Sequence, residues 1–106
     1  MPKKPVTSTI HPGEILLEEF MRPGGISING LALALRVPAT RISAIVNQTR
    51  GITADTALRL GRYFSSTSEF WMNLQRDYDL RIAANALRKQ IERDVQPRNA
   101  QPRSAA

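Results

Sequence analysis

The sequence predicts an all-α protein of five helices, the last of which extends beyond what a small core needs. Apolar residues recur every three or four positions through most of the chain, which is the period of an amphipathic helix. No stretch has the two-residue alternation of a half-buried strand. Breaks containing proline, glycine or serine divide the pattern at 23–25, 36–38, 48–51 and 65–67. The 106 residues suffice for one domain with a modest core.

The first helix is expected to begin at Pro12. Proline suits a first helical turn because the N–H that it lacks would have no partner there, and Glu14 complements the helix dipole. Residues 23–25, Pro-Gly-Gly, should end this helix, whose apolar face is formed by Ile15, Leu16, Phe20 and Met21. Residues 1–10 have little to bury, so we expect a flexible basic arm there.

The second and third helices are short and closely connected. Ser27 is a good N-cap, so a helix should run from Ile28 to about Leu35. Because Val37 precedes Pro38, it is disfavoured in a helical conformation, and the third helix can begin at Pro38. This third helix should run to about Asn47, with three residues pointing inward: Ile42, Ile45 and Val46.

The fourth and fifth helices complete the domain. Thr53 should cap a helix that reaches about Phe64, and Thr67 or Ser68 should cap the next one. The apolar stripe of the fifth helix is longer than the core of so small a domain requires. Residues 67–95 are therefore expected to close the core and to form a dimer interface, at which we place Tyr78, Ile82 and Leu87. The alternative is that this helix only closes the core of a monomer.

Residues 27–47 have the organisation of a helix-turn-helix. Two short helices joined by three residues are what this motif requires, and the outer side of the third helix is slim and polar. Such a side fits the major groove of DNA and reaches base edges. We expect the base-reading residues to be Ala39, Thr40, Arg41, Ser43, Ala44 and Asn47, with Arg41 making the strongest contact. The alternative is a helical bundle whose third helix merely has a solvated side.

The distribution of charge favours DNA as the partner. Within the net charge of +6, residues 27–66 contribute five arginines against one acid, Asp55. The planar guanidinium of arginine suits phosphates and guanine edges. We expect phosphate contacts on both sides of the third helix, from Ser27, Asn29, Gln48, Thr49 and Arg50. Residues 11–66 are thus the predicted domain that binds double-stranded DNA.

Catalytic and metal-dependent functions are disfavoured. The chain has no cysteine and one histidine, His11, for which a role in helix initiation or packing is favoured over metal ligation. The acids of the first and last helices look like solvated helix faces, and nothing arranges a nucleophile with a base. We therefore expect neither an enzyme nor a cofactor.

The chain is also expected to be soluble and to have no membrane partner. No apolar run approaches the roughly 20 residues that span a bilayer, and Met1–Thr9 lacks the apolar stretch of a secretory signal. We expect a cytoplasmic protein that is nucleoid-associated when bound to DNA. Residues 96–106, which contain two prolines, should form a disordered tail.

Five segments of the chain carry a family resemblance. They are His11–Leu16, Val37–Ser43, Asn47–Thr53, Ala57–Leu60 and, most discriminating, Glu69–Leu80. In this order, residues 11–83 resemble the HigA-type antitoxins of toxin–antitoxin modules, also grouped as the virulence-associated protein I family. That family lies within the lambda-repressor-like, Cro/C1 class of helix-turn-helix proteins.

The resemblance implies a lambda-repressor-like fold and two tasks. One is to bind an operator as a homodimer and to repress the promoter of its own module. The other is to neutralise a toxin that resembles RelE, a class of ribosome-dependent messenger-RNA nucleases. Arg36 and Gln48 stand where the family commonly has glycine. The position of Arg36 often needs positive φ, so we expect strain of about 1 kcal/mol or a shifted turn there.

Two other functions remain open. One is a stand-alone Cro/C1-type repressor without a toxin partner, which the nature of the upstream gene would discriminate. The other is an interaction module that mainly sequesters a toxic nuclease and binds DNA weakly. A sequence-specific repressor differs from such a module because it binds its operator at least about a thousandfold more tightly than it binds non-specific DNA.

Overall fold

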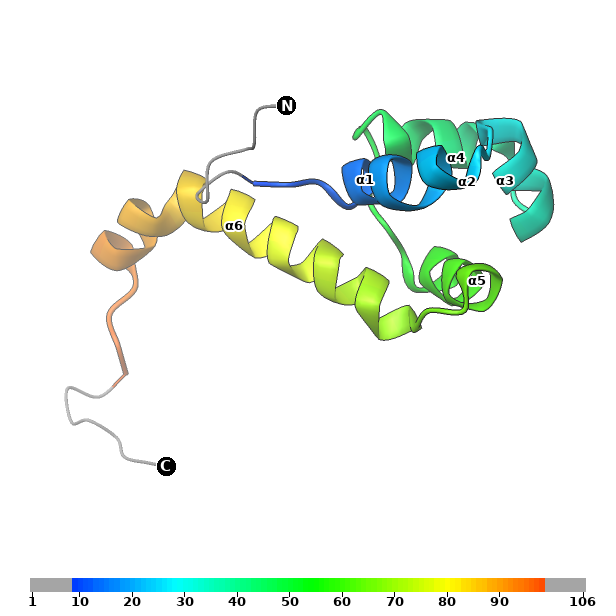
Figure 1. The fold of residues 1–106 in the computed structure, drawn as a ribbon. Coiled ribbons are helices and arrows are strands. Elements are labelled where there is room, and N and C mark those ends of the chain that lie inside the picture. The colour runs from blue at the N-terminus through cyan, green and yellow to red at the C-terminus, as the bar shows by residue number, and fades with distance from the viewer. Residues whose placement is uncertain (1–8, 99–106) are drawn as a thin grey trace.

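The computed structural model describes residues 9–98 and contains helices joined by short turns, with no strand in that range (Figure 1). The elements are α1 (Pro12–Ile15), the π-helical segment η1 (Leu16–Met21), α2 (Arg22–Gly24), α3 (Ile28–Leu35), α4 (Ala39–Val46), α5 (Ala54–Phe64) and α6 (Ser68–Asp94). The first three are continuous and correspond to the first predicted helix. The all-α prediction is therefore confirmed. Most of the arm expected at 1–10 and of the tail expected at 96–106 lies outside the described residues.

The first helix begins at Pro12 as predicted, and His11 is its N-cap. The Nδ1 atom of His11 accepts a hydrogen bond from the backbone N–H of Gly13 at 2.8 Å. The π-helical segment was not predicted, and Pro23 lies just beyond it, inside α2. Gly25, with φ of 64°, ends the helix in the left-handed region that glycine adopts without a steric penalty.

Helices α3 and α4 form the predicted helix-turn-helix pair. The hydroxyl of Ser27 caps α3 by accepting from the N–H of Gly30 at 2.9 Å, and residues 36–38 connect the two helices. Ile42 and Ile45 of α4 are fully buried, and Val46 is nearly so. These inward positions are confirmed, and they leave the opposite side of α4 turned away from the core.

The remaining helices also begin at the predicted caps. Thr53 accepts from the N–H of Thr56 at 3.4 Å, and Thr67 accepts from the N–H of Phe70 at 3.0 Å. The first turn of α6 closes the core with Trp71, which is fully buried and donates from Nε1 to the Ser66 hydroxyl at 3.0 Å. A buried tryptophan usually needs such a partner for its N–H.

One hydrophobic core joins η1, α3, α4, α5 and the start of α6. Its large members that are fully or almost fully buried are Leu16, Met21, Leu31, Leu35, Ile42, Ile45, Ile52, Leu60 and Trp71. Burying each such side chain stabilises the fold by about 1.5–3 kcal/mol. The core fixes α4 between α1 and α3, and α5 against α6.

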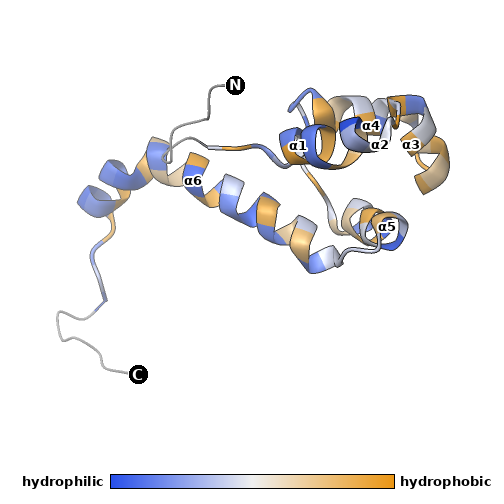
Figure 2. Cartoon of the chain, viewed as in Figure 1, coloured by the Kyte–Doolittle hydropathy of each residue, from blue (hydrophilic) through white to orange (hydrophobic). Residues whose placement is uncertain are grey.

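The C-terminal part of α6 leaves this core. After Trp71 no residue of the helix is fully buried, and Figure 1 shows its last turns projecting away from the other helices. Figure 2 shows apolar residues interspersed with polar ones along α6. None of the helices between residues 9 and 98 is long and apolar enough to cross a membrane.

Candidate nucleic-acid interface

The six residues that the sequence predicted to read bases lie on α4 and its C-cap, Asn47. Thr40 and Asn47 are exposed, whereas Ala39, Arg41, Ser43 and Ala44 are half-buried. None of the six belongs to the fully buried core, because the helical period places them away from Ile42 and Ile45. The structure thus brings the set onto one helix, with its members at different depths.

The flank of α4 that faces α3 forms a shallow hollow. Ser27, Ile28 and Asn29 of the α3 N-terminus line it together with Ala39, Thr40 and Ser43. Ser27 and Asn29, expected to contact phosphates, therefore lie beside three of the expected base-reading residues. The first turn of a helix also has backbone N–H groups without intrahelical acceptors, which favour an anion at this place.

The loop after α4 ends the helix in a compact motif. Gln48 has φ of 66°, its N–H donates to the Ile45 carbonyl, and the N–H of Thr49 donates to the Ala44 carbonyl. These paired bonds are those of a Schellman cap, in which the left-handed residue is usually glycine. Arg36, which ends α3, has φ of 62°, so the positive φ expected at this position is confirmed, whereas the positive φ of Gln48 was not predicted.

The polar side chains of this loop are exposed. Gln48, Thr49 and Arg50 all lie on the surface, although the Thr49 hydroxyl donates to the Ala44 carbonyl at 3.2 Å. Asn47 donates from Nδ2 to the Ser43 hydroxyl at 3.3 Å, within the outer side of α4. The three residues expected to contact phosphates after α4 are thus solvent-accessible at its C-terminal end.

Arg41 occupies the other flank of α4, beside α5. Its Nη1 forms an ion pair with Asp55 Oδ2 at 2.5 Å and lies 3.5 Å from the Thr56 hydroxyl. The side chain is only 23% exposed, so Arg41 does not extend freely into solvent. The sequence does not indicate this pair, because the two residues are 14 positions apart.

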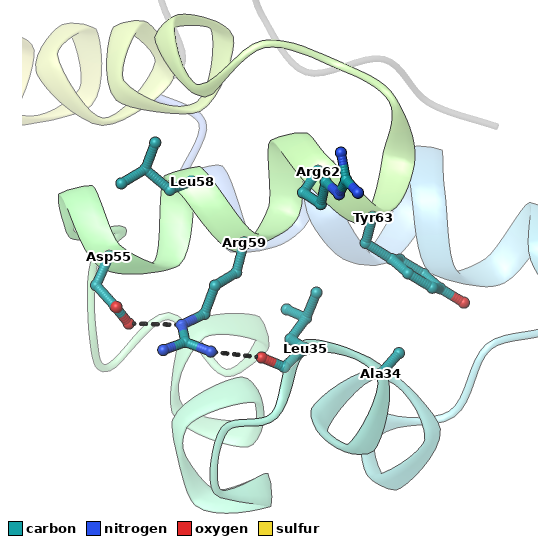
Figure 3. Close-up of a pocket in the computed structure, with 7 residues that line it drawn as sticks. All are labelled: Ala34, Leu35, Asp55, Leu58, Arg59, Arg62 and Tyr63. Atoms are coloured by element: carbon teal, nitrogen blue, oxygen red, sulfur yellow. Dashed lines mark hydrogen bonds and ion pairs between the residues drawn. The ribbon is translucent and has the colours of Figure 1, made fainter.

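Asp55 is shared by a second arginine. Arg59 donates from Nε to Asp55 Oδ2 at 3.1 Å and from Nη1 to the Leu35 carbonyl at 2.8 Å (Figure 3). The hydrogen bonds from Arg41, and next those from Arg59, lower the pKa of Asp55 below its ordinary value. The carboxylate is therefore ionised at neutral pH and links α4 with α5.

An open pocket lies beside this carboxylate and is lined by residues of α3 and α5. Figure 3 shows its lining residues, Ala34, Leu35, Asp55, Leu58, Arg59, Arg62 and Tyr63. Leu58 and Tyr63 are exposed there, at 63% and 45%. Sequence periodicity alone does not reveal this surface, since α3 and α5 meet only in the tertiary fold.

The residues expected at a dimer interface divide into two groups. Tyr78 is half-buried and packs edge-on against His11, with ring centroids 4.8 Å apart. Ile82 and Leu87 are exposed, at 45% and 42%. Tyr78 thus contacts its own chain, whereas the other two present apolar side chains to solvent.

His11 has the structural role that the sequence favoured. It caps α1 and packs against Tyr78, and only 4% of the residue is exposed. Burial lowers the pKa of His11, although the charge of Asp79 opposes this shift. Among residues 9–98, no three histidine, cysteine, aspartate or glutamate side chains are grouped so as to hold a metal ion.

Comparison with known proteins relates this architecture to helix-turn-helix regulators. No family model matches the chain. Virulence-associated protein I of Dichelobacter nodosus is 57% identical over 74 residues, which are 70% of this chain and 68% of that protein. YbaQ of Escherichia coli strain K12, described as an uncharacterised helix-turn-helix transcriptional regulator, is 41% identical over 90 residues, 85% of this chain and 76% of that protein. The solved structure of Pseudomonas aeruginosa antitoxin HigA with the higBA promoter has a TM-score of 0.84 and 50% identity, covering 87% of this chain and 100% of that chain.

Proposed function

The chain belongs to the family of HigA antitoxins and virulence-associated protein I, and from this premise we propose that it is a DNA-binding antitoxin that represses its own promoter. The observation that carries the proposal is the outer side of α4, where slim and polar side chains stand opposite a buried apolar side. This side fits the major groove of operator DNA. The likeness to HigA with promoter DNA supports the same use of the fold.

The contacts divide by type. Base edges are assigned to Ala39, Thr40, Arg41, Ser43, Ala44 and Asn47. Phosphates are assigned to Ser27 and Asn29 at the start of α3, and to Gln48, Thr49 and Arg50 after α4. Phosphate contacts fix the position of a protein on the duplex, and base contacts supply the sequence preference. Residues 11–66 would then be the DNA-binding part of the chain.

Dimerisation would supply the affinity that one short helix lacks. A two-fold dimer presents two reading helices about 34–36 Å apart, one turn of the double helix. We assign the interface to the projecting part of α6, because Ile82 and Leu87 expose apolar side chains there. Tyr78, which already packs on His11, would support this interface from its edge.

The antitoxin task would be to bind and neutralise a partner toxin. The family membership supports a toxin partner, and we propose a RelE-like messenger-RNA nuclease. Co-expression of the tagged chain with the neighbouring gene tests this assignment directly. Recovery of the gene product with the chain and rescue of growth are expected, whereas a toxic neighbour that neither binds nor is suppressed contradicts the antitoxin role.

Selection of DNA from a randomised pool tests the DNA-binding role. The wild-type chain should enrich a two-fold symmetric sequence with half-sites one helical turn apart. Asn47→Ala should weaken binding to that sequence more than to a shuffled duplex, and Asn85→Ala, an exposed asparagine of α6, is the matched control. A pool that stays random would show that the chain does not read sequence.

A stand-alone repressor is the second candidate. The likeness to YbaQ, described as a transcriptional regulator over 85% of this chain, favours it. Sequence selection together with no binding to any neighbouring gene product would support this candidate over the antitoxin.

A further inference from the structure

A chain of polar contacts links three helices behind the outer side of α4. The Leu35 carbonyl at the end of α3 accepts from Arg59 of α5, and Arg59 donates to Asp55 in the first turn of the same helix. Asp55 in turn accepts from Arg41 of α4 at 2.5 Å. Arg41, the only arginine among the residues assigned to bases, thus pairs with a carboxylate that Arg59 also holds in place.

This arrangement holds the Arg41 guanidinium in place. The side chain is 23% exposed, and Nη1 also lies 3.5 Å from the Thr56 hydroxyl. Both contacts are made by Nη1, so further N–H donors remain on Nη2 and Nε. An arginine reads guanine through two parallel N–H donors, which requires a defined orientation of its planar head.

A contribution to folding stability does not by itself explain the ion pair between Arg41 and Asp55. Asp55 is about half exposed, at 53%, and ion pairs near the surface contribute little to folding. A carboxylate directly beside a DNA-facing helix also repels phosphates, so its presence weakens binding to any DNA. The cost to general affinity is offset if the carboxylate improves discrimination between sequences.

We propose that Asp55 is a specificity-determining residue that holds Arg41 in the orientation needed to read a base and keeps it from binding phosphates of arbitrary sequence. The inference rests on the proposed function, since it assumes that α4 meets DNA. Asp55 acts through Arg41 and is a positioning residue. Without it, the guanidinium is free to bind the nearest phosphate of any duplex.

Asp55→Asn tests the proposal because it removes the charge and keeps the size of the side chain. Dissociation constants are measured for the duplex that the wild-type chain selects from a randomised pool and for a shuffled duplex of equal composition. The ratio of the two should fall about tenfold, the order of discrimination that one well-oriented arginine–base pair provides. The salt dependence of binding to the shuffled duplex should steepen as Arg41 gains a phosphate.

Two controls separate positioning from a general charge effect. Asp77→Asn removes an exposed carboxylate from α6, which also pairs with a neighbouring arginine, and should leave the ratio unchanged. Asp55→Asn is also introduced into the Arg41→Ala chain, where it should no longer change the ratio. Circular dichroism and urea unfolding of each variant establish that the fold is intact.

Each outcome decides the question. A lowered ratio that requires Arg41 supports the proposal. An unchanged ratio, or an equal fall with and without Arg41, overturns it while leaving the DNA-binding function in place. A wild-type chain that selects no sequence overturns both.

Discussion

The α-carbon of Gly13 lies against the carbonyl of Ile45, where α1 crosses α4. A Cβ atom added to Gly13 would stand 1.8 Å from that carbonyl oxygen, which no real structure tolerates. The contact sets the distance between the first helix and the helix that carries the outer polar side. The glycine is required here by close approach, since its φ is not in the left-handed region.

Gly13→Ala should therefore be strongly destabilising. The new methyl group must push α1 away from α4, and overpacking of this severity costs about 3 kcal/mol or more. Urea unfolding should show a much lower midpoint. Gly24→Ala is the control, because its Cβ would meet only the flexible end of the Ile26 side chain, and it should change stability little. Equal stability of the two variants would contradict the close packing of α1 on α4.

Gln48→Gly should stabilise the protein by up to about 1 kcal/mol. Gln48 has φ of 66°, a conformation that glycine adopts without the steric penalty of a Cβ atom. Thermal or urea unfolding measures the gain. The same substitution at Gln90, an exposed position inside α6, should instead cost about 1 kcal/mol. A loss of stability at both sites would show that the left-handed conformation carries no strain.

His11 should make the free energy of unfolding depend on pH below neutrality. Burial lowers its pKa in the folded state, so between its ordinary value of 6.5 and the lowered value only the unfolded state takes up the proton. Stability should fall as the pH drops below 6.5, and above it His11 should have no effect. His11→Asn retains an acceptor for the N-cap and does not titrate. Parallel pH profiles for wild type and variant would rule out this contribution.

Arg50→Ala should weaken binding to all DNA sequences alike. Arg50 is exposed in the loop after α4, and we assign it to a phosphate. Losing one phosphate contact should reduce the slope of log affinity against log salt by about 1. Arg88→Ala, which removes an exposed arginine of α6, should leave the slope unchanged. A loss confined to one sequence would mean that Arg50 contacts a base instead.

Leu87→Lys should convert a dimer into a monomer. Leu87 is 42% exposed on the projecting part of α6, and a charge there would be desolvated in an interface. Light scattering at micromolar concentration should give the mass of two chains for wild type and of one for the variant. Ala86→Lys adds the same charge one position away and is the control. A wild-type mass of one chain would exclude the dimer outright.

The helices were predictable because their boundaries are encoded locally. Ser27, Thr53 and Thr67 each cap a helix through a hydroxyl that accepts from an N–H three residues later. The positive φ of Arg36 was expected from the family resemblance, and the structure confirms it. Features within one or two turns of the chain thus follow from the order of the residues.

The features that were not predictable depend on tertiary distance. Nothing in the pattern around Arg41 indicates that Asp55, 14 residues later, accepts from its guanidinium. The approach of Gly13 to Ile45 likewise arises only when α1 packs on α4. The π-helical segment before Pro23 has no distinct sequence signal, because its residues also fit an ordinary helix.

The length of α6 separates two regions of the protein in space. At 1.5 Å per residue, its 27 residues extend for about 40 Å, and only the first turns pack on the core. A macromolecule held by the distal turns therefore need not cover the α3–α4 surface. The same chain has room to engage two different macromolecules at once, with the rigid helix acting as a spacer between them.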